Sequence, residues 1–116
     1  PRPGDDKIAH KVSNLLNIPL YETAVNPNRL VHTGGNYMSD GLGLGFSSNL
    51  VLDENPTKSK ADVDGIMNDY LGVSEYVNMT NLPYDDIHHI DMHMKLMNEN
   101  TLLVGEYQLV FLMDLK

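Results

Sequence analysis

The chain has 116 residues, which is enough for one small domain with its own buried core. Its 16 acidic residues outnumber 8 lysines and arginines, and the resulting charge of −8 repels phosphate backbones and anionic lipids, so we expect neither nucleic acid nor membrane as a partner. The absence of cysteine excludes a disulfide framework, a zinc ribbon, an iron–sulfur site and a thiol nucleophile from these residues.

The first predicted element is a helix that follows the extended segment Pro1–Gly4, in which two prolines and a glycine oppose helix formation. We expect Asp5 or Asp6 to cap this helix. Its apolar residues recur at helical spacing: Ile8, Val12, Leu15 and Leu16. The pattern stops at Asn17, and it predicts a helix that packs through one face.

Two strands are predicted next, at residues 29–38 and 46–52, because both runs are rich in β-forming residues. The glycine-rich residues 39–45 connect them. We interpret the glycines in both regions as tight-turn positions. A dinucleotide fingerprint would need a glycine where Ser48 stands, and no Gly-Lys-Ser/Thr sequence is present for a P-loop.

A second helix is predicted to begin at a capping box formed by Ser59 and Asp62, and to end before Gly72. Its apolar residues have helical spacing: Val63, Ile66, Met67, Tyr70 and Leu71. Gly72 stands where a left-handed residue commonly ends a helix.

Three strands are predicted in the remainder, at residues 75–79, 88–96 and 101–107, with Asn98–Asn100 as the last turn. The element order is then helix, two strands, helix, three strands. Helices alternating with strands through short connections predict a mixed α/β layer structure.

The densest polar cluster is Ile87–His93, which holds three of the five histidines. In a strand, His89, Asp91 and His93 would share one face, because alternate side chains point the same way. Three interpretations of this face stay open. It is a proton-transfer and substrate-binding surface, a zinc or iron(II) site built from two imidazoles and a carboxylate, or a solvated strand face.

Arg2 stands between two prolines that restrict its backbone. This arrangement suits a guanidinium that grips a carboxylate through two hydrogen bonds, although a lone arginine is more often a surface residue. The residue types alone leave both interpretations open.

Three segments together resemble one family: Pro1–Asp6, His32–Gly41 and Ile87–His93. In this order and at these spacings they are similar to the bacterial, Porphyromonas-type peptidylarginine deiminases, which are relatives of the agmatine deiminases. The resemblance runs from Pro1 to about Tyr107 and covers nearly the whole chain.

The resemblance implies a pentein β/α propeller, an α/β fold of five helix-and-strand blades around a central site. Residues 1–116 would be a fragment of a single guanidine-deiminase catalytic domain that supplies about two blades. In the family, a cysteine thiolate attacks the guanidinium carbon, ammonia leaves, and water hydrolyses the covalent thiouronium intermediate to give citrulline. The resemblance implies no cofactor and no metal.

By position, the resemblance makes His89 the catalytic histidine and Asp91 a guanidinium-binding aspartate. It makes Arg2 a residue that grips the carboxylate of a C-terminal arginine. The nucleophilic cysteine would lie beyond Lys116, so we expect this chain alone to be inactive. Arg2 favours an arginine-containing peptide as substrate, and agmatine or another small guanidine is the alternative.

A further alternative is a non-catalytic interaction module, either a metal-binding one that uses the face of His89, Asp91 and His93, or one that docks a partner through its acidic surface and apolar last strand. An open apolar sheet edge would favour self-association. The compartment stays open between export and the bacterial cytoplasm.

Overall fold

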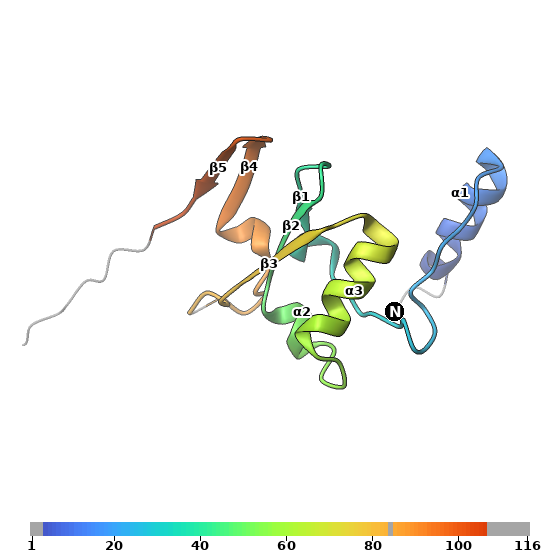
Figure 1. Ribbon diagram of the computed structural model, residues 1–116, viewed down its shortest axis with the longest axis horizontal. Coiled ribbons are helices and arrows are strands. Elements are labelled where there is room, and N and C mark those ends of the chain that lie inside the picture. The colour runs from blue at the N-terminus through green and yellow to red at the C-terminus, as the bar shows by residue number, and fades with distance from the viewer. Residues whose placement is uncertain (1–3, 84, 107–116) are drawn as a thin grey trace, which may run out of the picture. The chain divides into compact units, whose positions relative to one another are not determined.

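The computed structural model describes residues 4–83 and 85–106 (Figure 1). The chain divides into two compact units, one ending at Leu30 and the other beginning at Val31. The described residues form helices and two small open sheets, which confirms the predicted α/β class. No helix within the described ranges has the length and apolar character needed to span a bilayer.

The first unit contains a short 3-10 helix, η1 (Asp5–Lys7), which leads directly into α1 (Ile8–Leu16). The predicted cap at Asp5 or Asp6 is wrong, because Gly4 precedes the first turn and both aspartates lie within it. The helix ends as predicted at Asn17, whose φ of 51° is left-handed. The apolar stripe of α1 is exposed within the described unit, so the predicted packing of this face is not formed there.

The second unit is built on a three-stranded sheet in which β2 (Leu44–Ser48) is central. β1 (Met38–Ser39) pairs with it antiparallel, and β3 (Glu75–Met79) pairs with it parallel. A parallel pair needs a crossover connection, which contains α2 (Leu50–Asp53) and α3 (Lys60–Leu71). Figure 1 shows α3 running alongside β3.

The predicted capping box at the beginning of α3 is confirmed. Ser59 Oγ accepts a hydrogen bond from Asp62 N at 3.2 Å, and Asp62 Oδ2 accepts one from Ser59 N at 2.8 Å. Hydrogen bonds from the Ser59 side chain and backbone lower the pKa of Asp62. The helix ends at Gly72, whose φ of 67° is the left-handed conformation predicted there.

A second sheet is a hairpin of β4 (Met94–Asn98) and β5 (Thr101–Val104). It follows a 3-10 turn, η3 (Ile90–Met92), and Leu96 N donates to Met38 Sδ at 3.1 Å, which links the hairpin to β1. Every residue of β5 is exposed.

The strand β2 alternates between the two faces of its sheet. Gly45 and Ser47 face the side of Tyr76 and α3, where Gly45 leaves room for the Val73 side chain. The opposite face packs a hydrophobic cluster of Phe46, Ile90 and Met94 with Met38, Leu44, Val77, Met79 and Leu96. This alternation puts Ser48, the last residue of β2, on the same face as Ile90.

Four of the predicted strands are shorter than expected. Of residues 29–38 only Met38 lies in a strand, β1, because a 3-10 turn, η2 (Gly34–Asn36), precedes it. The second strand ends at Ser48, and Leu50 begins α2. The strand predicted over residues 88–96 begins only at Met94. The strand predicted at 101–107 ends at Val104, since Gly105 and Glu106 are not in a strand, and Tyr107 lies outside the described residues. The strand predicted at 75–79 is confirmed.

Candidate functional site

Residues 31–36 run beside the sheet without joining it, and side chains that follow α2 hold them there. Asn55 Oδ1 accepts from Val31 N at 2.9 Å, and Asn55 Nδ2 donates to Val31 O at 2.8 Å. Thr33 Oγ1 donates to Glu54 Oε1 at 3.0 Å. Because these bonds replace strand pairing, the segment does not form the predicted strand.

Asn36 joins this segment to the rest of the site. Its side chain is fully buried, and its Oδ1 accepts from Ser48 N at 2.8 Å and from Ile90 N at 3.1 Å. Ser48 Oγ in turn donates to the carbonyl oxygen of His88. The end of β2, the turn η2 and the start of η3 therefore meet at one asparagine.

His89 lies directly before η3, and its half-buried ring packs against Gly35. A Cβ atom built on Gly35 would overlap Nδ1 of His89 and would lie 3.2 Å from both Cε1 and Cγ. The Nδ1 edge of the imidazole therefore faces Gly35, and Nε2 lies on the other side of the ring. The structure thus brings two segments, His32–Gly41 and Ile87–His93, into direct contact.

Asp91 lies in η3, two residues after His89, and it is exposed. It lines a pocket of about 330 Å³ between η3 and the hairpin. The other lining residues are Met92, His93, Met94, Lys95, Leu103, Val104 and Gly105. The lining therefore includes one carboxylate, one lysine and four apolar residues. A carboxylate beside apolar side chains suits a cation carried on an aliphatic chain.

The predicted shared face of His89, Asp91 and His93 is wrong, because residues 90–92 form a 3-10 turn instead of a strand. His93 is buried, with 8% of its surface exposed, whereas Asp91 is exposed. Within residues 4–83 and 85–106, no group of three or more histidine, aspartate or glutamate side chains is placed to hold a metal ion.

The backbone turns sharply just before His89. His88 has a left-handed φ of 57°, which is uncommon for a residue with a Cβ atom. The Asp85 carboxylate stabilises this turn, because Oδ1 accepts from Ile87 N at 3.1 Å and Oδ2 accepts from His88 N at 2.9 Å. Such uncommon backbone conformations are frequent at functional sites.

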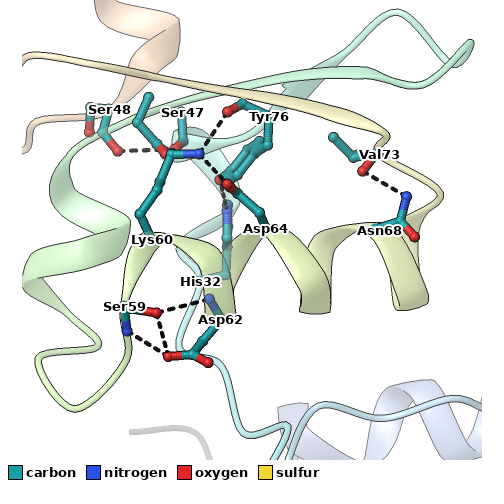
Figure 2. A network of polar contacts seen from close by, with 11 residues as sticks. His32, Ser47, Ser48, Ser59, Lys60, Asp62, Asp64, Asn68, Val73 and Tyr76 are labelled. Carbon is teal, nitrogen blue, oxygen red and sulfur yellow. Dashed lines mark hydrogen bonds and ion pairs between the residues drawn. The ribbon is translucent and has the colours of Figure 1, made fainter.

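A partly buried polar cluster around Tyr76 contacts His32, near the start of the same segment (Figure 2). His32 Nε2 lies 2.9 Å from the Tyr76 hydroxyl. Burial lowers the pKa of His32 and raises the pKa of Tyr76 to about 12, so both side chains are uncharged at neutral pH. Lys60 Nζ donates to Tyr76 O at 3.0 Å and to the Asp64 carboxylate, which ties the cluster to α3.

Arg2, the third predicted site residue, lies outside the described residues, so its role stays a prediction. The buried asparagines Asn36 and Asn55 were not predicted from the sequence. The only signal for Asn36 was its place in the segment His32–Gly41, where two preceding glycines indicated no more than a turn.

Residues 1–108 match the sequence model of the Porphyromonas-type peptidyl-arginine deiminase family. The match includes both segments that meet at Asn36 and Gly35 and extends over most of the 116 residues. The resemblance seen in the three sequence segments is confirmed.

Proposed function

The chain belongs to the Porphyromonas-type peptidyl-arginine deiminase family, and we propose that it carries part of the site that hydrolyses a C-terminal, peptidyl arginine to citrulline and ammonia. The family implies a hydrolase that acts on guanidino groups. The observation that carries the proposal is the contact between the Gly-Gly-Asn turn and the turn that holds His89 and Asp91.

His89 is the proposed catalytic residue, acting as the acid that protonates departing ammonia. Its half-buried ring is packed on Gly35 by the Nδ1 edge, which leaves Nε2 for the proton transfer. A positioned histidine is the most common group for such a transfer.

Asp91 is the proposed partner of the substrate guanidinium. It is exposed and lines a pocket together with apolar residues from the hairpin, including Leu103 and Val104. A carboxylate forms paired hydrogen bonds with a guanidinium, and an apolar wall suits the methylene groups of arginine.

The proposed reaction proceeds in two steps. A cysteine thiolate attacks the guanidinium carbon, and the C–N bond to one amino group breaks as His89 donates a proton and ammonia leaves. Water then attacks the same carbon, returning one proton to His89 and releasing the other to solvent, the C–S bond breaks, the thiolate is restored, and the product is citrulline. These 116 residues contain no cysteine, so the chain supplies no thiolate and is proposed to be inactive by itself.

The proposed whole fold is a pentein propeller, in which residues 1–116 form part of a single catalytic domain. Its support is the family match, together with the mixed helices and strands of the described chain. The proposed role of Arg2 is to grip the C-terminal carboxylate of the peptide, and this role selects a peptide over agmatine.

The test is citrulline release by the full-length protein containing this chain, measured with a peptide ending in arginine and with agmatine. We expect His89→Ala to lower turnover by about 10²-fold or more, because general acid catalysis contributes at least this much. His10→Ala, in the first unit, is the control and should leave turnover unchanged.

Preference for agmatine over the peptide would move the assignment to agmatine deiminase and would remove the role of Arg2. Absence of turnover with both substrates, together with a stoichiometric metal in the purified protein, would contradict the deiminase and favour a metal-binding interaction module.

A further inference from the structure

The two glycines of the turn η2 have different surroundings, although they are adjacent and identical. A Cβ atom on Gly34 would have no neighbour within 4 Å, whereas one on Gly35 would overlap Nδ1 of His89. Neither glycine has a positive φ, so the backbone conformation does not explain Gly35. What Gly35 provides is room for the imidazole.

Asn36 fixes the distance between the turn η2 and His89. It is fully buried and accepts from both Ser48 N and Ile90 N, so the backbone of η2 is tied to the residue that directly follows His89. Its Nδ2 atom has no hydrogen-bond partner among the described residues, so the side chain holds the two segments together through the two bonds that Oδ1 accepts. The turn and the histidine thus keep one spacing.

We propose that Gly35 is a positioning residue for His89: its missing side chain lets the Nδ1 edge of the imidazole pack on the backbone and directs Nε2 toward the substrate. Only the expected effect of Gly35 on turnover rests on the proposed function. The position of the ring can be tested whether or not the protein is a deiminase.

The expected effect of Gly35→Ala is displacement of the ring without loss of the fold. The three atoms nearest to the added methyl group would all belong to the His89 ring, which is the end of a side chain that can rotate. A displaced general acid donates its proton poorly, so kcat should fall by about 10²-fold while KM changes little. Gly34→Ala is the matched control, because its methyl group would meet open space.

The experiment uses the full-length protein with selectively labelled histidine and glycine. In the wild type, we expect a nuclear Overhauser contact between Gly35 Hα and His89 Hε1. Gly35→Ala should shift the ring ¹⁵N signals of His89, and Gly34→Ala should leave them in place. Absence of the contact in the wild type would overturn the inference even if the Gly35 variant does not fold.

The two proposals fail in different ways. If turnover depends on His89 but Gly35→Ala changes neither the ring signals nor kcat, the positioning role is wrong and the deiminase proposal stands. If no substrate is turned over but the ring signals shift only in Gly35→Ala, the placement of the imidazole is correct and the proposed function is wrong. An equal loss of kcat in both alanine variants, without a shift of the His89 signals, would also contradict the positioning role.

Discussion

At the scale of single residues, the site depends on side chains whose roles are set by their neighbours. Gly34 and Gly35 are indistinguishable in a sequence, yet of the two only Gly35 has another residue's side chain, that of His89, packed against its backbone. His89 and Asp91 could be selected from the sequence because the motif around them resembles a known family. Asn36 could not be selected, since its role comes from Ile90, which is 54 residues away.

His32 should make stability depend on pH. Burial lowers its folded pKa below the ordinary value of about 6.5, so the unfolded chain binds the proton more readily. Its contribution to the free energy of unfolding is therefore full above about pH 6.5 and is lost as pH falls toward the lower folded pKa.

The measurement is urea unfolding of the wild type and of His32→Gln at several pH values. The variant keeps an acceptor for the Tyr76 hydroxyl but does not titrate, so its stability should fall less on acidification. His10→Gln, at the surface of the first unit, serves as the control. Equal slopes for the wild type and the His32 variant would contradict the prediction.

At the scale of elements, local signals predicted α3 well and predicted the extent of four strands poorly. Ser59 and Asp62 bond each other three residues apart, and Gly72 ends the helix through its own left-handed backbone, so both signals are visible in the sequence. By contrast, a short apolar run such as residues 50–52 fits a strand or a helix. Ser48 ends the strand and favours the helix α2, because its backbone N–H donates to Asn36 Oδ1 and its Oγ accepts from Leu50 N at 3.2 Å.

Asn36→Leu should destabilise the junction between β2 and η3. It leaves two buried N–H groups without an acceptor, each of which costs about 1–3 kcal/mol, so we expect a loss of about 2–6 kcal/mol in the free energy of unfolding. Asn36→Asp keeps an acceptor oxygen, so its free energy of unfolding should fall less than that of Asn36→Leu. Chemical denaturation of both variants checks this order, and a leucine variant as stable as the aspartate variant would refute it.

At the scale of the whole molecule, the hairpin presents an apolar strand that is not covered in the described structure. Leu103 is 60% exposed and Val104 is 50% exposed on β5. Open strand edges with apolar side chains promote association. The proposed self-association of this chain would use that edge.

Leu103→Lys should weaken such association, because a charged side chain on an edge strand opposes pairing. The measurement is sedimentation of the wild type and the variant over a range of concentrations. Leu42→Lys, in the exposed turn between β1 and β2, provides the control. A wild-type chain that stays monomeric throughout, or an equal effect of both substitutions, would show that β5 is not the contact.

The bond from Ile90 to Asn36 also has a consequence for the order of folding. Contacts between residues distant in sequence require closure of long loops and form slowly. All strands of the three-stranded sheet precede residue 80, whereas Ile90 and His89 follow it. During synthesis, the sheet and α3 are therefore complete before the histidine emerges, and we expect it to dock last, onto a scaffold already in place.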